Sequence, residues 1–191
     1  ETKKLVLGAG CFWCVEAYFE SLPGVIDAVS GYAGGEIPNP TYNNVAAGRT
    51  KHAEVVEITY DPEAISHRQL IDFFWTTHDV TDGRGVAPDF GPQYRSILFY
   101  ASEEEKLVID ASKAAYQSSG KIRKPIATQI VPLDQFYKAE AYHQEFAARN
   151  PNHRYVQGVL VPKLKKLGLP FPAVEEERIN KTFFGGLAVE G

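Results

Sequence analysis

The sequence has only two cysteines, no methionine and no long hydrophobic run. Two cysteines in 191 residues are too few for a disulfide framework, which excludes a small disulfide-stabilised fold. No apolar stretch approaches the ~18 residues that a membrane-spanning helix needs, so we expect no membrane partner. The first residues, Glu1 to Leu5, lack the hydrophobic region of a signal peptide. We therefore expect a cytoplasmic protein, although a leader removed from the chain would leave the same start.

The charge balance excludes a further class of partner. The chain carries 20 Lys and Arg against 24 Asp and Glu, a net charge of -4, and its basic residues are scattered. Because nucleic-acid binding needs clustered positive charge, we expect no nucleic-acid partner. Hydrophobic residues at 44% and charged residues at 23% are ordinary for a globular chain. The length suits a single domain over residues 1–191, which we expect to be a monomer.

The first hundred residues predict two β-α-β units in succession. Apolar residues after the turn Gly8-Ala9-Gly10 recur at helical spacing, and Ser66 caps a second helix that reaches about residue 78. Residues 33–51, rich in Gly, Pro, Asn and Thr, form a long loop of the kind that often carries function. The two units follow the ferredoxin-like split βαβ order. Strands are predicted at residues 4–7, 25–32, 53–60 and 95–100.

The second half of the chain continues the same pattern. Helices are predicted at about 103–118 and 134–149, with a strand near 128–131 between them. The tail from Pro162 is predicted to be irregular. The whole order predicts an α+β fold, a two-layer α/β sandwich around the split βαβ core.

Cys11 and Cys14 stand where the first helix begins. Unpaired N–H groups and the positive end of the helix dipole stabilise a thiolate there, so we expect the pKa of Cys11 to be lowered. The glycines before it allow a tight turn and leave the sulfur accessible. Cys14 lies about one helical turn further along, so the two sulfurs face the same way and can form a disulfide. Spacing alone leaves two interpretations open, a redox pair and two buried structural cysteines.

Further segments show that the sequence resembles the type A peptide methionine sulfoxide reductases (MsrA). They are similar to family signatures and follow in the same order between Leu5 and about Tyr155. The segments are Gly10-Cys11-Phe12-Trp13, Gly31-Tyr32-Ala33-Gly34-Gly35, Pro40-Thr41-Tyr42, His52-Ala53-Glu54-Val55, Asp89-Phe90-Gly91-Pro92-Gln93-Tyr94-Arg95-Ser96 and Phe136-Tyr137-Lys138-Ala139-Glu140-Ala141-Tyr142-His143-Gln144. The resemblance implies reduction of the S epimer of methionine sulfoxide, as the free amino acid or in oxidised proteins, with no cofactor or metal.

The resemblance also implies a role for each matching residue. Cys11 is the nucleophile that attacks the sulfoxide sulfur, and Phe12 and Trp13 form the hydrophobic pocket for the substrate's methyl group. Glu54 is the acid that protonates the sulfoxide oxygen. This step needs help because the oxygen is a poor leaving group until it is protonated.

Three more residues complete the implied site. Tyr42 and Tyr94 match tyrosines that help to bind the sulfoxide oxygen, and Asp89 matches a further active-site carboxylate. Glu54 has to begin the reaction protonated, and we expect an apolar setting and the charge of Asp89 to raise its pKa. Without the resemblance, Glu54 would be interpreted as a solvent-facing strand residue.

Cys14 departs from the family pattern. Many relatives carry Gly at this position and place a second cysteine in a glycine-rich tail, whereas the tail here, including Gly185-Gly186, has none. We predict that Cys14 attacks the Cys11 sulfenic acid to form a Cys11–Cys14 disulfide, which thioredoxin or glutaredoxin then reduces. The alternative is a one-cysteine cycle, in which an external thiol reduces the sulfenic acid and Cys14 is a packing residue.

Two other functions compete with this prediction. A general thiol–disulfide oxidoreductase also carries C-x-x-C at a helix start, and its substrates are protein disulfides. A structural zinc site needs about four ligands, and the chain has neither a second C-x-x-C nor paired histidines at finger spacing. No catalytic role is expected for His52 or His143.

Overall fold

The computed structural model describes residues 1–178, in which six strands form a sheet of order β7-β6-β1-β3-β2-β8. The strands of this sheet are β1 (Lys3–Ala9), β2 (Val25–Ala33), β3 (Ala53–Tyr60), β6 (Ser96–Tyr100), β7 (Gln129–Pro132) and β8 (Tyr137–Lys138). A separate hairpin consists of β4 (Gly85–Val86) and β5 (Asp89–Phe90). The helices are α1 (Phe12–Glu20), α2 (Tyr42–Ala46), α3 (His67–Phe74), α4 (Glu103–Gln117), α5 (Phe146–Arg149) and α6 (Val161–Leu167), with 3-10 turns at Pro92–Tyr94 and Ala141–His143 and a π-helix at Val156–Leu160.

The centre of the sheet has the predicted ferredoxin-like order. β1, α1 and β2 form the first β-α-β unit, and β3, α3 and β6 form the second. Neighbouring strands in the order β6-β1-β3-β2 are antiparallel. β7 extends one edge in parallel with β6, and β8 extends the other edge antiparallel to β2. The predicted α+β class with a split βαβ core is therefore confirmed.

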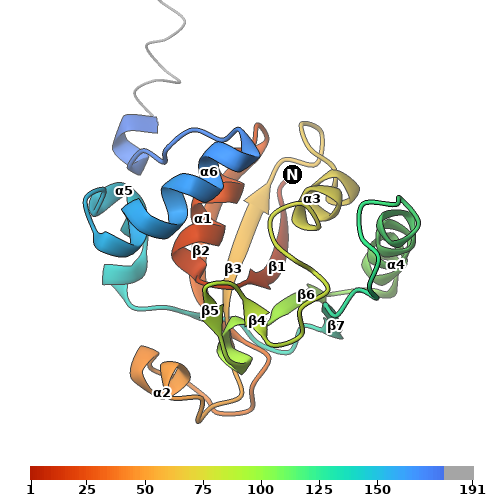
Figure 1. The fold of residues 1–191 in the computed structure, drawn as a ribbon, viewed down its shortest axis with the longest axis horizontal. Helices are drawn as coiled ribbons and strands as arrows, with labels where there is room; N and C mark the ends of the chain where they lie inside the picture. The colour runs from red at the N-terminus through yellow and green to blue at the C-terminus, as the bar shows by residue number, and fades with distance from the viewer. Residues whose placement is uncertain (179–191) are drawn as a thin grey trace, which may run out of the picture.

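Helices cover one face of the sheet. α1 lies across the strands, with α6 on one side of it and α3 on the other (Figure 1). Apolar residues of α1, α3 and α4 pack against strand residues such as Val56 and Leu98 to form the main core. A smaller cluster around Val55 on the opposite face packs against residues 131–136 instead of a helix. Because side chains alternate along a strand, Glu54 shares the face of Val56 and points toward α1.

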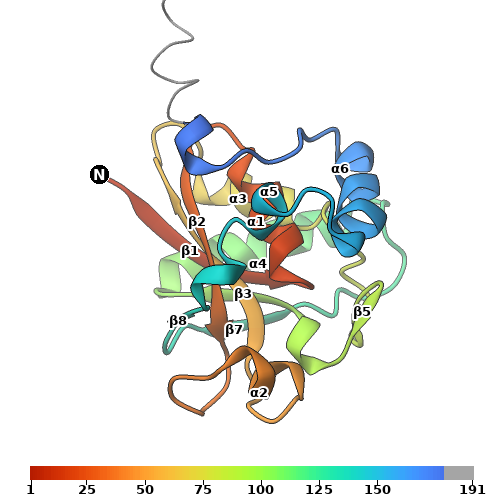
Figure 2. The same cartoon turned by 90° about the vertical axis from the view of Figure 1, so that its left-hand side faces the viewer.

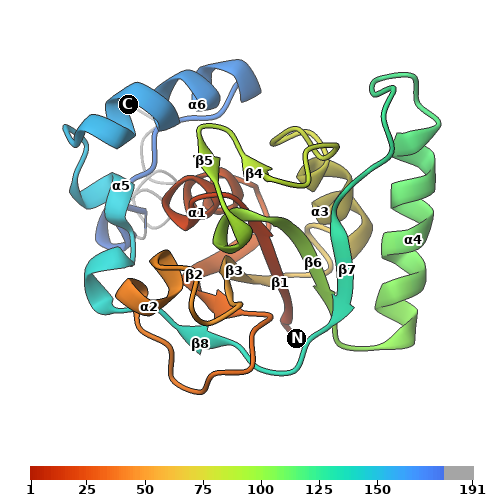
Figure 3. The same cartoon turned by 60° about the horizontal axis from the view of Figure 1, so that its bottom comes forward.

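The N-terminal end of α1 meets two later segments of the chain. Figures 2 and 3 show the β4–β5 hairpin and α6 beside this end of the helix. The Lys163 ammonium on α6 donates a hydrogen bond to the carbonyl oxygen of Ala87 in the hairpin turn, at 2.8 Å. Segments more than 70 residues apart in sequence are thus held together around the Cys11 turn. In residues 1–178, no helix has the length and apolar character to cross a membrane.

The prediction of one helix over residues 134–149 is wrong. The chain forms the short edge strand β8 and then a 3-10 turn, and only α5 at its end is α-helical. The exposed edge of β2 explains the difference, because its backbone groups need partners. The Gln144 side chain accepts a hydrogen bond from the backbone N–H of Ser30 at 2.9 Å and donates one to the Ser30 carbonyl at 2.8 Å.

Three other boundaries differ from the prediction. The tail from Pro162, predicted to be irregular, contains α6, which continues the π-helix and buries Leu160 and Leu164, four residues apart, in the main core. The helix capped by Ser66 forms a capping box as expected but ends at Phe74. The loop over residues 33–51 contains α2. Gly185-Gly186 lie outside the described residues.

Candidate active site

The turn before α1 places Cys11 at the helix N-terminus. Cys11 is the N-cap residue, and its carbonyl accepts hydrogen bonds from the backbone N–H groups of Cys14 at 3.1 Å and Val15 at 3.3 Å. Gly10 has φ +93, a conformation that L side chains rarely adopt, and a Cβ there would lie 2.8 Å from the Cβ of Val86. Glycine is therefore required for the β4–β5 hairpin to pack against the Cys11 turn.

The two cysteine thiols lie close enough together to shift each other's pKa. Both cysteines are free; Cys11 is half-buried and Cys14 is buried. Burial raises the pKa of Cys11, and its hydrogen bond to Cys14 and the charges of Cys14 and Glu54 raise it further. The pKa of Cys14 is lowered, first by the hydrogen bond from Cys11 and then, against the effect of burial, by Lys163 and Tyr155. The predicted lowering of the Cys11 pKa is wrong, because desolvation and neighbouring negative charge outweigh the helix dipole.

Glu54 lies inside the molecule beside the start of α1. It is only 2% exposed, although a glutamate side chain is ordinarily found at the surface. Its Oε1 atom accepts a hydrogen bond from the backbone N–H of Phe12 at 3.2 Å. Burial raises the pKa of Glu54 to about 8, and the charges of Asp89 and Cys14 act in the same direction. Glu54 is therefore protonated near pH 7, as acid catalysis requires.

The two predicted tyrosines lie around the same acid. Burial raises the pKa of Tyr42 to about 12 and also raises that of Tyr94, and for both the nearby charges of Glu54 and Cys11 add to the effect. Tyr42 begins α2, and its backbone N–H donates a hydrogen bond to Glu140 at 3.0 Å. The phenol groups thus stay neutral and can donate hydrogen bonds beside Glu54.

Phe12 and Trp13 occupy different depths of the site. Phe12 is buried, and its ring packs against His143 with centroids 4.9 Å apart. Trp13 is half-buried, and its ring stacks on Phe146 with centroids 3.7 Å apart and an interplanar angle of 8°. The indole N–H donates to Nδ1 of His143 at 3.0 Å. Trp13 is therefore the fixed apolar wall beside the thiols, and Phe12 lies behind it.

Three residues that contact the site were not predicted from the sequence. His143 and Phe146 hold the Trp13 ring, and Tyr155 contacts Trp13 edge-on with centroids 5.7 Å apart. The hydroxyl of Tyr155 also donates a hydrogen bond to Asp89. Because these contacts span more than 60 residues of sequence, no local periodicity indicates them.

His52 holds the backbone of the loop between β2 and α2. Its Nδ1 accepts a hydrogen bond from the backbone N–H of Gly35 at 2.9 Å, and its Nε2 lies 2.7 Å from the carbonyl oxygen of Ile37. These contacts fix the loop that leads to α2. Across residues 1–178, no group of three or more His, Cys, Asp or Glu side chains is arranged to hold a metal ion.

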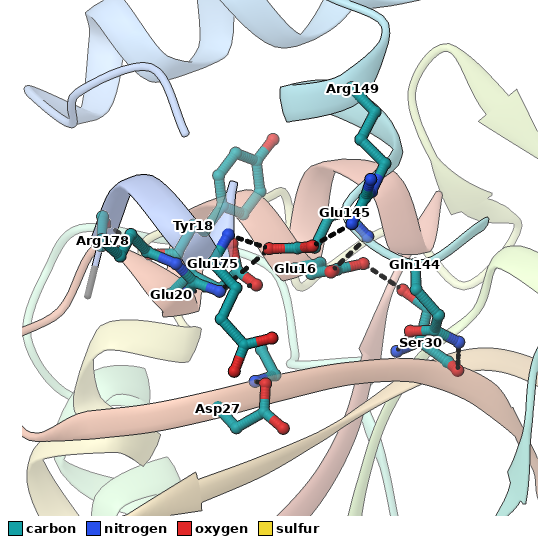
Figure 4. Close-up of polar contacts among 12 residues, drawn as sticks. Glu16, Tyr18, Glu20, Asp27, Ser30, Gln144, Glu145, Arg149, Glu175 and Arg178 are labelled. Atoms are coloured by element: carbon teal, nitrogen blue, oxygen red, sulfur yellow. Dashed lines mark hydrogen bonds and ion pairs between the residues drawn. The ribbon is translucent and has the colours of Figure 1, made fainter. Parts of the chain in front are cut away.

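A buried carboxylate cluster lies along α1 beyond the thiols (Figure 4). Glu16 accepts hydrogen bonds from the Ser30 hydroxyl at 2.6 Å and from the backbone N–H of Glu145 at 2.8 Å. The Arg178 guanidinium lies 3.1 Å from a carboxyl oxygen of Glu145 and 3.4 Å from one of Glu20. The cluster ties α1 to β2, to the segment before α5 and to the end of the described chain.

We expect this cluster to make stability depend on pH. Burial raises the pKa of Glu16 to about 7 and that of Glu20 to about 9, so the folded chain holds these protons more tightly than the unfolded chain does. The two protons stabilise the folded chain fully at a pH below the ordinary carboxyl pKa. This part of the free energy of unfolding is lost as the pH rises through 7 to 9. Between pH 6 and 8, the free energy of unfolding of a Glu20→Gln variant is expected to decline less steeply with pH than that of the wild type, by up to ~1.4 kcal/mol per pH unit.

Urea unfolding at a series of pH values measures this effect. The matched control is Glu176→Gln, which replaces an exposed carboxylate close to Arg178 in sequence. Its free energy of unfolding should change with pH as steeply as that of the wild type. If Glu20→Gln also keeps the wild-type slope, the Glu20 carboxyl is not protonated in the folded protein at neutral pH.

A dithiol at a helix start, a protonated carboxyl group beside it and a fixed aromatic wall define a thiol-dependent oxidoreductase. The family model described as peptide methionine sulfoxide reductase matches residues 3–170, and the chain belongs to this family.

Individual relatives agree with this assignment. The peptide methionine sulfoxide reductase MsrA of Sulfolobus acidocaldarius is 43% identical over 173 residues, covering 91% of this chain and 97% of that protein. The reduced form of Mxr1 from Saccharomyces cerevisiae superposes with a TM-score of 0.75 at 36% identity, covering 80% of this chain and 88% of that one. Mxr1 in complex with Trx2 is also similar, with a TM-score of 0.54 at 30% identity, covering 77% of this chain and 86% of that one.

Proposed function

We propose that the chain reduces the S epimer of methionine sulfoxide, free or in oxidised proteins, to methionine. The observation that carries this proposal is the buried Glu54 carboxyl group, whose pKa of about 8 keeps it protonated beside the Cys11 thiol. Exchange between thiols and disulfides involves no oxygen that must be protonated, so a general thiol–disulfide oxidoreductase has no need of such an acid. Membership of the methionine sulfoxide reductase family supports the same substrate.

The first step transfers the sulfoxide oxygen to Cys11. The Cys11 sulfur attacks the sulfoxide sulfur while its proton passes to Cys14, which has the lower pKa of the two, begins this step as the thiolate and ends it as a thiol. Glu54 protonates the sulfoxide oxygen, which Tyr42 and Tyr94 hold by hydrogen bonds, and the apolar wall of Trp13 receives the methyl group. The oxygen ends on Cys11, so the products are methionine and the Cys11 sulfenic acid, with Glu54 left as a carboxylate.

The second step forms a disulfide within α1. Cys14 attacks the Cys11 sulfenic acid, the Cys11–Cys14 bond forms and water is released. Thioredoxin or glutaredoxin then reduces the disulfide. The complex of Mxr1 with Trx2 supports thioredoxin as the reductant, and the contact between the two thiols supports Cys14 as the resolving cysteine. The one-cysteine cycle, in which an external thiol reduces the sulfenic acid, is the competing route.

Separated sulfoxide epimers test the proposed activity. With dithiothreitol as the reductant, the full chain is expected to consume methionine S-sulfoxide and to leave the R epimer, as followed by chiral chromatography. Cys11→Ser is the matched control and should consume neither epimer, because a serine hydroxyl is far less nucleophilic than a thiolate. Consumption of both epimers at equal rates, or of neither by the wild-type chain, would contradict the proposed function.

A further inference from the structure

Cys14 is surrounded by polar groups that the sulfoxide-reducing step does not use. It is 2% exposed, so a charge on its sulfur has almost no water to stabilise it. Tyr155 and Tyr18 both lie next to this sulfur, and Lys163 acts on it from α6. A buried packing cysteine needs none of these neighbours, so their presence indicates that the Cys14 sulfur takes part in chemistry.

A chain of hydrogen bonds leads from the Cys14 sulfur toward the β4–β5 hairpin. The Cys14 thiol donates to the hydroxyl oxygen of Tyr155, with sulfur and oxygen 3.9 Å apart. The Tyr155 hydroxyl donates in turn to Oδ2 of Asp89 in β5, in a short hydrogen bond. Both donors point the same way, from sulfur to phenol to carboxylate. Three segments of the chain supply these groups: α1, the residue before the π-helix and the hairpin.

From this arrangement we propose that Tyr155 and Asp89 form a proton relay that deprotonates Cys14, so that Cys14 attacks the Cys11 sulfenic acid as a thiolate. The inference rests on the proposed function, in which Cys14 is the resolving cysteine. It assigns Asp89 to the disulfide-forming step and adds Tyr155 as a residue that acts on Cys14.

The relay closes with all atoms and electrons accounted for. The Cys14 proton passes to the Tyr155 oxygen while the Tyr155 proton passes to the Asp89 carboxylate. An electron pair of the Cys14 sulfur then forms the S–S bond to Cys11, and the S–O bond of the sulfenic acid breaks. The oxygen leaves as hydroxide and takes up, through solvent, the proton that Asp89 received from Cys14, so water is released and Asp89 is again a carboxylate. Cys14 is oxidised and the sulfenic sulfur is reduced, so no other reactant is needed.

Nearby charges favour the same direction of proton transfer. The hydrogen bond from Cys11, the positive charge of Lys163 and the Tyr155 hydroxyl lower the pKa of Cys14, against burial and the charge of Asp89. The Tyr18 hydroxyl is buried and has no hydrogen-bond partner among residues 1–178. Burial and the charges of the two cysteines raise its pKa, so it stays a neutral donor beside a Cys14 thiolate.

A single-turnover experiment separates the relay from the chemistry before it. The reduced full-length chain is mixed with one equivalent of methionine S-sulfoxide, and two products are followed in time. Methionine release reports oxygen transfer to Cys11. Mass spectrometry after dimedone trapping reports the ratio of sulfenic acid to Cys11–Cys14 disulfide. Tyr155→Phe and Asp89→Asn are compared with Tyr116→Phe, a matched control on the remote helix α4.

Tyr155→Phe is expected to keep the wild-type methionine burst while disulfide formation slows about 10-fold or more and sulfenic acid accumulates. Asp89→Asn is expected to release the same one equivalent of methionine more slowly, because the charge of Asp89 helps to raise the pKa of Glu54, and to accumulate sulfenic acid afterwards. Raising the pH should restore disulfide formation in Tyr155→Phe, because hydroxide then removes the Cys14 proton directly. A misplaced but intact thiol would not respond in this way. The preserved burst also shows that both variants are folded.

Two results would overturn the relay. Disulfide formation at the wild-type rate in both variants excludes a role for Tyr155 and Asp89. In the wild-type chain itself, a methionine burst followed by persistent sulfenic acid would show that Cys14 does not resolve Cys11, which removes the step that the relay serves. Absence of the burst in the wild-type chain is a different result, because it contradicts the proposed sulfoxide reduction itself.

Discussion

Glu54→Gln is expected to lower kcat/KM for methionine S-sulfoxide by about 100-fold to 10,000-fold, the range typical of a lost general acid. Glutamine has the same shape, and its Oε1 can still accept the hydrogen bond that the Phe12 backbone N–H donates at 3.2 Å. It has no proton to transfer, so the sulfoxide oxygen remains a poor leaving group. Steady-state kinetics with a saturating reductant measure the effect.

The pH profile distinguishes acid catalysis from a structural role of Glu54. Because the raised pKa of Glu54 is about 8, wild-type activity should fall as the pH rises through that value, and Glu54→Gln should lack this fall. Glu57→Gln is the matched control on the same strand, since Glu57 forms only an exposed hydrogen bond with Lys4. Near-normal rates in Glu54→Gln would mean that another group protonates the oxygen.

Cys14→Ser is expected to reduce turnover with thioredoxin by about 100-fold, because a serine hydroxyl does not attack a sulfenic acid at neutral pH. One equivalent of methionine should still be released, more slowly than in the wild type because Cys14 also accepts the Cys11 proton. The Cys11 sulfenic acid should then persist and react with dimedone. A coupled assay with thioredoxin, thioredoxin reductase and NADPH measures turnover, and a single-turnover assay measures the burst.

Dithiothreitol is the control for this variant, since a small thiol reduces an accessible sulfenic acid directly and should sustain turnover of Cys14→Ser. Cys14→Ala should behave in the same way, because both substitutions remove the sulfur and neither adds bulk. Unchanged turnover of Cys14→Ser with thioredoxin would establish the one-cysteine cycle and leave Cys14 as a packing residue.

Local sequence patterns predicted the central part of the fold well. β3 was predicted over the residues that it occupies, because its run of apolar and β-branched residues suits a strand that is buried on both faces. The capping box at Ser66 fixed the start of α3. The segment over residues 134–149 failed because its helical spacing competes with unpaired backbone groups at the edge of β2, and a local pattern does not show that edge.

The candidate site was also predicted only in part. The spacing of Cys11 and Cys14 left a redox pair and two buried structural cysteines both open, and the resemblance to the family supplied the role of Cys11 and that of Glu54. Neither showed that burial and neighbouring charge place the lower pKa on Cys14, since both depend on groups brought in from distant segments. Cytoplasmic localisation and a monomeric state stay predictions.

The sequence by itself determined that a glycine turn leads into a helix with two cysteines one turn apart, because turn chemistry and helical periodicity are local properties. It also determined the order of the two β-α-β units that form the centre of the sheet. Only the tertiary structure decided that Glu54 is buried away from solvent beside Cys11 and that Tyr155 connects Cys14 with Asp89. Desolvation and hydrogen bonding depend on which distant segments meet, so these properties exist only in the folded chain.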